Sequence, residues 1–335
     1  MKKLLSLFGC LFLLSCADDP GYTLNQNSGG ALGTSYNIAY FTKEKLDLQR
    51  EIDSVFKVIN QSMSTYQRDS DISRINAGDS TVVVDQMFRE VFSLSKEVYE
   101  ATGGAFDPTV GILVNAWGFG PGKAMELDST EVDSLMQYVG FGKVALKDDN
   151  TIYKQDEQIY FDFNAIAKGY AIDRLALVLD QKGISDYLVE VGGEIVARGR
   201  NINKDKPWVV GIDDPQVTGE RALKKAVALT DRALASSGNY RKFRVDSVSG
   251  KKFVHTIDPK TGFTKDSNVL AATVIAENCA TADAYATALM AMELENSKML
   301  LEGQDGLEAY IIYLDKNGDT REFMTPGFRE IVVEL

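Results

Sequence analysis

The clearest change of hydrophobic period in the chain lies near residue 165. Tyr160, Phe161 and Phe163 are aromatic residues typical of a short β-strand. Further along, apolar residues recur at the three- and four-residue spacing of one helix face: Ile172, Leu175, Ala176 and Leu179. Asn164 stands between the two patterns, where a helix N-cap belongs. The pattern therefore predicts a strand that runs directly into a helix beginning at Asn164.

Two charged residues bracket the start of this predicted helix, namely Asp162 and Lys168. Free N–H groups and the positive end of the helix dipole allow a helix N-terminus to hold a phosphate, and Lys168 would add a full positive charge. The alternative is an ordinary capped helix with a solvated lysine. Local sequence leaves both interpretations open.

The same periodicities predict the remaining elements. The predicted helices span 48–59, 86–100, 129–138 and 281–292, followed by one that ends near 302. The predicted strands span 34–41, 187–191, 195–197, 208–212, 226–230, 243–245, 252–255, 269–276 and 308–314, with another near 322 and a hairpin that turns at 148–150. No Pro/Ser-rich linker interrupts residues 31–335, so we expect one α+β domain, either undivided or in two lobes.

The first thirty residues differ in character from the rest. Lys2 and Lys3 place positive charge directly before a short apolar run, and this order is typical of a secretory signal. The run ends in Leu-Leu-Ser-Cys16, which resembles a lipobox. We therefore predict a signal peptide over 1–15, lipidation of Cys16, and a flexible polar tether over 16–30. The alternatives are an ordinary signal peptide with an incidental cysteine and an uncleaved anchor.

Composition narrows the possible partners and locations. The chain has 335 residues, 44% of them hydrophobic and 25% charged, which suits a globular protein with a large core. Its net charge of −12 argues against a nucleic-acid partner, and a bound cation would help an acidic protein hold an anion. Cys10 and Cys16 lie in the leader and at the predicted lipidation site, which leaves Cys279 with no partner for a disulfide. We expect an exported lipoprotein, anchored at the cytoplasmic membrane's outer face, in the periplasm or at the outer membrane.

Few residues remain that could carry chemistry. His255 is the single histidine, which argues against the usual zinc sites, and the chain contains neither Gly-x-Ser-x-Gly nor a P-loop motif. Either a structural role or a role as a base fits His255. Asp283 and Thr287 lie four residues apart on a predicted helix, so their oxygens share one face and suit a hard cation such as Mg²⁺. The alternative is a solvated helix face.

Nine short motifs occur in a fixed order along almost the whole chain. They are Leu32-Gly-Thr34, Met63-Ser-Thr-Tyr66, Gly103-Gly-Ala-Phe-Asp-Pro-Thr109, Trp117-Gly-Phe-Gly120, Asp162 through Asp173, Leu188-Val-Glu-Val-Gly-Gly-Glu194, Ser237-Gly-Asn-Tyr-Arg241, His255-Thr-Ile-Asp-Pro-Lys-Thr-Gly262 and Ala282-Asp-Ala-Tyr-Ala-Thr-Ala288. Each is weak alone, but together they resemble the ApbE family, the FAD:protein FMN transferases. The lipobox agrees, since many members of that family are exported lipoproteins.

This resemblance implies an activity. The family cleaves FAD at its pyrophosphate and transfers the FMN half to a threonine or serine hydroxyl of a partner protein, with release of AMP. The implied partner is an extracytoplasmic subunit of a redox complex or another flavin-carrier domain. The resemblance also implies an ApbE-like domain in which the FAD site could lie between two lobes.

Roles for individual residues follow from the same resemblance. The implied FAD contacts are Leu32, Tyr66, Ala105, Phe106, Asp107, Asp162, Lys168 and Ile257. Asp283, Thr287 and the backbone carbonyl of Ala165 are the implied Mg²⁺ ligands. His255 is the candidate base for the incoming hydroxyl, a role that Asp283 could share. Two other functions use the same residues: a Mg²⁺-dependent FAD pyrophosphatase that gives FMN and AMP, and a non-catalytic lipoprotein that binds or stores FAD.

Overall fold

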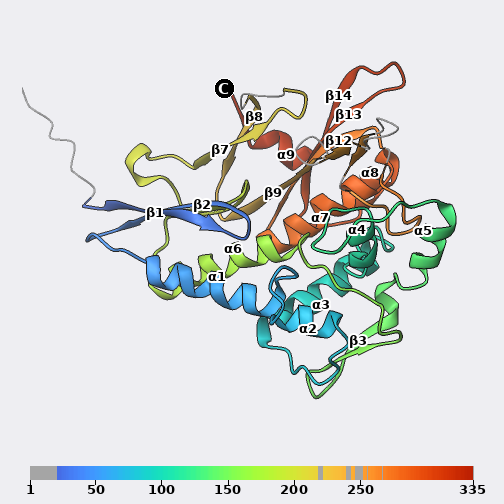
Figure 1. The fold of residues 1–335 in the computed structure, drawn as a ribbon. Coiled ribbons are helices and arrows are strands. Elements are labelled where there is room, and N and C mark those ends of the chain that lie inside the picture. Colours follow the sequence, from blue (N-terminus) through green and yellow to red (C-terminus); the bar gives the residue numbers. More distant parts are fainter. Residues whose placement is uncertain are drawn as a thin grey trace, which may run out of the picture.

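One large antiparallel sheet organises the molecule (Figure 1). The computed structural model describes residues 21–217, 222–238, 243–245, 252–254, 256–265 and 267–334. Within them, eight strands pair in the spatial order β1 (Thr23–Ala31), β2 (Thr34–Thr42), β5 (Tyr187–Val191), β6 (Glu194–Arg198), β9 (Arg232–Gly238), β12 (Val269–Ala276), β13 (Glu308–Leu314) and β14 (Thr320–Met324). Every neighbouring pair in this sheet is antiparallel.

Helices cover one face of this sheet. The elements that contribute to this main core are α1 (Gln49–Met63), α2 (Asp71–Asn76), α3 (Gln86–Ala101), α6 (Ala167–Gln181), α7 (Cys279–Ala291) and α8 (Leu294–Glu302). Alternate strand residues such as Ile38, Val189 and Val274 point into this layer and are almost fully buried. The period-2 alternation of each strand thus meets the apolar stripe of each helix, which is the usual way such layers bury their surface.

A second, smaller layer covers the other face. It consists of a three-stranded sheet and a short helix, in the spatial order β15 (Val332–Val333), β8 (Leu223–Leu229) and β7 (Trp208–Asp213), with α9 (Pro326–Glu330) beside β13. Trp208, Val210 and Phe328 pack there against strand residues such as Ala197 and Ile275.

A third apolar cluster lies at the edge of the helical layer. It joins α4 (Gly111–Ala116) and α5 (Ser129–Met136) to Ile257 and the loop around it. Two small hairpins complete the described elements: β3 (Val144–Leu146) with β4 (Ile152–Lys154), and β10 (Phe243–Val245) with β11 (Lys252–Val254). Among the described residues, no helix is long and apolar enough to cross a membrane.

The α+β class and most predicted elements are confirmed. The helix expected over 86–100 is α3, and the hairpin expected at 148–150 connects β3 to β4. The helix expected from 281 begins two residues earlier, because Asn278 caps it by accepting a hydrogen bond from the Thr281 amide.

The tether predicted over 16–30 is wrong from Thr23 onward. Residues Thr23–Ala31 form β1, which pairs with β2 along its whole length. The polar side chains of this segment led to the wrong prediction, because Asn25 and Asn27 are buried and form hydrogen bonds instead of apolar contacts. Asn25 donates to Thr42 at 2.6 Å and Asn27 donates to Asp47 at 2.8 Å. Residues 1–20, with the predicted signal peptide and Cys16, lie outside the described residues.

The strand predicted at 160–163 and the cap predicted at Asn164 are also wrong. Tyr160 forms only an isolated bridge with Val110, and the helix begins at Ala167 with Ile166 as its N-cap. Asn164 instead donates its own amide to Asp162 Oδ1 at 2.7 Å, which forms a local turn. The aromatic residues belong to the core and not to a strand, because Phe161 and Phe163 are fully buried in the main core.

Candidate active site

The first turns of α6 and α7 touch at their backbones. A Cβ atom at Gly169 would lie 2.4 Å from the carbonyl oxygen of Cys279, so only glycine allows this approach. Asp173 fastens the contact, because its carboxylate accepts from the amides of Cys279 at 2.7 Å and Ala280 at 2.8 Å. These amides belong to the start of α7, where a negative charge is favourable. The two helix starts are therefore held together as one unit.

Asp283 of α7 bonds to the first turn of α6. Its Oδ2 accepts from the Gly169 amide at 3.1 Å. Regular helix bonding begins at the next residue, where the Tyr170 amide donates to the carbonyl of Ile166 at 2.9 Å. The Ala165 carbonyl thus lies just before the helix, close in sequence to the groups that Asp283 contacts.

Lys168, which is partly buried, forms an ion pair with the buried Glu194. Lys168 Nζ lies 2.8 Å from Glu194 Oε2, and the Glu194 side chain is only 4% exposed. Glu194 is the first residue of β6 and follows a two-residue turn, Gly192–Gly193, in which both residues have positive φ. That backbone shape favours glycine. The turn brings a carboxylate from the sheet to the start of α6.

Burial and neighbouring charges shift the pKa values in this cluster in opposite directions. Burial alone would lower the pKa of Lys168, but the carboxylates of Asp283 and Glu194 outweigh it and raise the pKa of the ammonium. Burial raises the pKa of Asp283, whereas Lys168 and the Gly169 amide act to lower it. The pKa of Glu194 is also raised by its burial, against the opposing effect of Lys168. Lys168 is therefore held as a cation between two carboxylates.

Asp283 and Thr287 share one face of α7, as predicted. The Thr287 hydroxyl lies 3.4 Å from Ser237 Oγ of β9, which places it at the sheet side of the helix. With the Ala165 carbonyl, these residues offer a carboxylate, a hydroxyl and a carbonyl, all oxygen donors of the kind that Mg²⁺ prefers. Among the described residues there is no group of three or more His, Cys, Asp or Glu residues arranged for a metal. The donor set fits a hard cation that keeps water or phosphate oxygens, and does not fit a zinc site.

Tyr66 and Asp162 lie close enough for the charge of Asp162 to act on the Tyr66 hydroxyl. Tyr66 follows α1 and is 63% exposed, which leaves its ring free to stack on a planar ligand. Partial burial raises the pKa of the Tyr66 hydroxyl, and the charge of Asp162 adds to the effect. Asp162 in turn has a pKa raised by burial, although the Asn164 amide opposes the shift.

The predicted contacts Ala105, Phe106 and Asp107 form a buried turn after α3. The Asp107 carboxylate accepts from the amide and the hydroxyl of Thr109, at 2.8 and 2.6 Å. These bonds use the carboxylate to shape the turn, so a ligand here would meet mainly the backbone. The Asp162 amide donates to the carbonyl of Pro108 at 2.8 Å, which ties this turn to the segment before α6.

Leu32 occupies the tip of the β1–β2 hairpin. Its φ of 51° lies in the left-handed region, which is uncommon for leucine and typical of strained functional turns. The backbone carbonyl of Ser35, three residues later, accepts a hydrogen bond from the Gly192 amide at 3.0 Å. The hairpin tip therefore lies beside the turn that leads into Glu194.

Ile257 lies in the third apolar cluster, buried against Leu113 and Trp117. The Trp117 indole donates to the carbonyl of Gly262 at 2.9 Å and so fastens the loop that carries Ile257. His255, two residues before Ile257, lies outside the described residues, and its predicted role as a base stays a prediction.

Sequence reasoning gave no role to two residues of this region, Asp173 and Glu194. The sequence feature that could have pointed to Glu194 is the Gly-Gly-Glu run that follows a buried strand. The partner of that glutamate depends on how β6 meets α6, which no local pattern contains. The same holds for Asp173, whose two amide partners are more than a hundred residues away in the chain.

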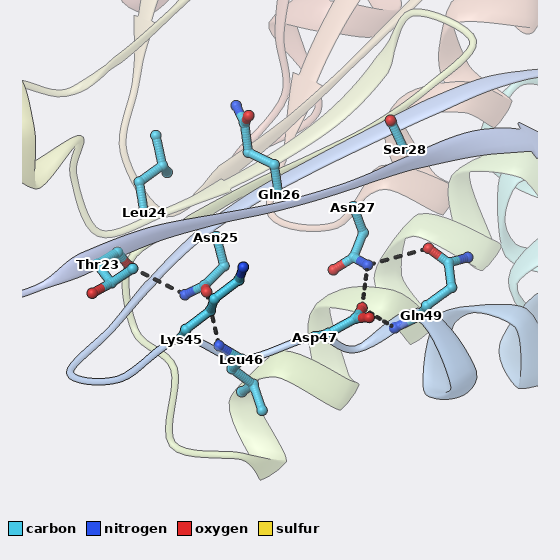
Figure 2. Close-up of a pocket in the computed structure, with 10 residues that line it drawn as sticks. All are labelled: Thr23, Leu24, Asn25, Gln26, Asn27, Ser28, Lys45, Leu46, Asp47 and Gln49. Atoms are coloured by element: carbon cyan, nitrogen blue, oxygen red, sulfur yellow. Dashed lines mark hydrogen bonds between the residues drawn. The ribbon is translucent and has the colours of Figure 1, made fainter.

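A surface hollow lies away from these residues. It has a volume of about 470 Å³ and is lined by residues 23–28 of β1 and by Lys45, Leu46, Asp47 and Gln49 (Figure 2). Its polar side chains bond mainly to one another; Asn27, for example, donates to both Asp47 and Gln49. None of the predicted site residues lines it, so we do not assign it to the chemistry.

Comparison with known proteins agrees with the motifs. The family model described as the ApbE family matches residues 32–311. The chain is 36% identical to the FAD:protein FMN transferase of Haemophilus influenzae over 95% of both chains, and 35% identical to that of Vibrio cholerae over 98% of both. The solved structure of the flavin transferase ApbE from Vibrio cholerae superposes with a TM-score of 0.81 at 32% identity, and covers 92% of this chain and 99% of that one. The chain belongs to the ApbE family.

Proposed function

We propose that this protein transfers the FMN half of FAD to a threonine or serine hydroxyl of a partner protein and releases AMP. The names of its relatives and its place in the ApbE family support this activity. The observation that carries the proposal is at the joined starts of α6 and α7, where Asp283 accepts a hydrogen bond from the amide of Gly169, the residue next to Lys168, and its charge acts on the Lys168 ammonium. A cation and a cation-binding carboxylate at the same pair of helix starts suit a pyrophosphate, whose charge must be neutralised for phosphoryl transfer.

The oxygen donors described above would hold Mg²⁺ through Asp283, Thr287 and the Ala165 carbonyl. When bound, the ion would supply positive charge that stabilises the pyrophosphate oxygens. Lys168 would contact the same oxygens from the α6 side. Tyr66 would stack on the flavin, and Leu32, Asp162, Ile257 and the Ala105–Asp107 turn would hold other parts of FAD.

Bond making and breaking follow from this arrangement. The acceptor hydroxyl oxygen attacks the phosphorus of the FMN half, the pyrophosphate bond breaks, and AMP carries away the bridging oxygen. His255 is our candidate to take the proton of the hydroxyl. Positioning and charge do most of the catalytic work in such a reaction, so the rigid α6–α7 contact is suited to it.

The location and partner of the protein are part of the same proposal. The Leu-Leu-Ser-Cys16 sequence supports an exported lipoprotein attached to a membrane by lipid at Cys16. Such a protein would meet extracytoplasmic acceptors, such as a subunit of a redox complex or another flavin-carrier domain.

The decisive experiment follows the flavin. The purified protein is incubated with FAD, Mg²⁺ and a candidate acceptor with a reactive threonine, and in-gel flavin fluorescence is recorded after denaturation. We expect a fluorescent acceptor band that EDTA abolishes. AMP release without a band would show a pyrophosphatase, and bound FAD with neither product would show a flavin-binding lipoprotein; either result would overturn the transferase.

A further inference from the structure

Two buried carboxylates act on the Lys168 ammonium, but it pairs with only one of them. Lys168 Nζ lies 2.8 Å from Glu194 Oε2. The charge of Asp283 also acts on Lys168, yet Asp283 Oδ2 accepts from the Gly169 amide at 3.1 Å. Both carboxylate side chains are at least nine-tenths buried. Glu194 is therefore the carboxylate that pairs with the ammonium, whereas Asp283 bonds to the backbone of α6.

The choice of Glu194 and not Asp283 as the partner of Lys168 matters, because Asp283 is the one carboxylate in the proposed cation site. Lys168, Glu194 and Asp283 together carry one positive and two negative charges, so a divalent cation would leave the cluster with a net positive charge toward a pyrophosphate. An ammonium paired with Asp283 would occupy the same oxygens and would repel the cation. The cation therefore needs Lys168 to stay with its other partner.

We propose that Glu194 is a positioning residue that holds the Lys168 ammonium off Asp283 and so keeps Asp283 free to bind a divalent cation. The proposal rests on the proposed function, since it assumes the cation site at Asp283. It assigns to Glu194 no contact with FAD or with the reacting atoms.

The sheet makes Glu194 a stable partner. Two hydrogen bonds fix the turn before it. The Gly193 amide donates to the Glu190 carboxylate at 2.7 Å, and the Gly192 amide donates to the backbone carbonyl of Ser35 at 3.0 Å. Glu194 then enters β6, which lies between β5 and β9 in the middle of the sheet. Lys168, by contrast, has a long flexible side chain. If Glu194 lost its charge, the partly buried ammonium would turn to the nearest remaining carboxylate, because an unpaired buried charge is costly.

The test measures metal binding without FAD and without turnover. Mn²⁺, which suits the same oxygen ligands, is titrated into the purified full-length chain, and free Mn²⁺ is read by electron paramagnetic resonance. We expect Glu194→Gln to weaken Mn²⁺ binding about 10- to 100-fold, the usual effect of losing a group that supports a metal ligand. In that background, Lys168→Met should restore most of the loss, whereas Lys168→Met alone should change affinity much less. This coupling between the two substitutions is the signature of the proposal.

Glu190→Gln is the matched control, because Glu190 supports the same turn but does not contact Lys168; its Mn²⁺ affinity should match the parent. Additive effects of Glu194→Gln and Lys168→Met would overturn the proposal while leaving the cation site intact. Binding in the parent that Asp283→Ala does not reduce would instead overturn the cation site, and the proposal with it. Recovery of binding in the double variant also shows that this variant folds.

Discussion

At the scale of single residues, the site depends on a few side chains whose surroundings differ sharply. Asp283 is buried, bonded to one backbone amide and next to a cation, whereas Tyr66 is mostly exposed. Such contrast is typical of sites in which buried groups hold charge and an open group receives the ligand. It leads to two predictions about individual residues.

Asp283→Ala should abolish Mg²⁺-dependent turnover. The substitution removes the only carboxylate among the proposed cation ligands and leaves Lys168 paired with Glu194. Transfer is measured as acceptor fluorescence over a range of Mg²⁺ concentrations. Thr281→Ala, at a partly exposed residue of the same helix start, is the control and should behave as the parent. Unchanged turnover in Asp283→Ala would refute the metal site.

His255→Ala should keep FAD binding and lose transfer, by about 10²- to 10⁴-fold if the residue acts as the base. Binding is followed by quenching of flavin fluorescence and transfer by the gel assay. A variant with full transfer activity would remove His255 from the mechanism.

At the scale of elements, the α6–α7 contact decides where the charged groups lie. The contact depends on a residue without a side chain, Gly169, and on the cap that Asp173 provides. Both features hold the start of α6, which carries Lys168, against the start of α7, which carries Asp283. Two predictions test them.

Gly169→Ala should push the helix starts apart, because its Cβ would overlap the Cys279 carbonyl oxygen. We expect a loss of about 1–3 kcal/mol in the free energy of unfolding, together with lower transfer activity. Urea denaturation measures the first and the gel assay the second. Gly142→Ala, which meets no atom within 4 Å, should leave both unchanged. Equal stability of the two variants would show that the helices do not pack this closely.

Asp173 should make stability depend on pH. Burial raises its pKa to about 6 from an ordinary value of 3.8, despite the two amides that act to lower it. Between these values the folded state binds more protons than the unfolded state, so this group's contribution to the free energy of unfolding falls as pH rises from about 4 to about 6. Asp173→Asn cannot titrate. Its stability relative to the parent should therefore increase from about pH 4 to about pH 7, as measured by urea denaturation; a constant difference would contradict the shift.

At the scale of the whole molecule, β1 belongs to the folded domain and not to a tether. It pairs with β2 at nine positions and carries the hairpin tip at Leu32. The polar side chains Asn25 and Asn27 join it to the segment after β2. The domain boundary therefore lies about eight residues earlier than polarity suggested.

Removal of β1 should accordingly damage the fold. A chain that begins at Gly21 should melt at the same temperature as the full-length protein, whereas a chain that begins at Leu32 should melt at a lower temperature and lose FAD binding. Circular dichroism and flavin fluorescence measure the two effects. Identical melting of both shortened chains would mean that β1 adds nothing to the domain.

The sequence alone determined the fold class, the family motifs and most helices and strands, because hydrophobic periodicity and short motifs are local properties of the chain. It also placed Asp283 and Thr287 on one helix face. It failed where burial came from long-range hydrogen bonds, as in β1, and where aromatic residues served packing rather than a strand, as at Phe161 and Phe163. Only the tertiary structure paired Lys168 with Glu194 and joined Asp173 to the start of α7. These contacts depend on which helix crosses which strand, and that crossing is decided by the packing of the whole core.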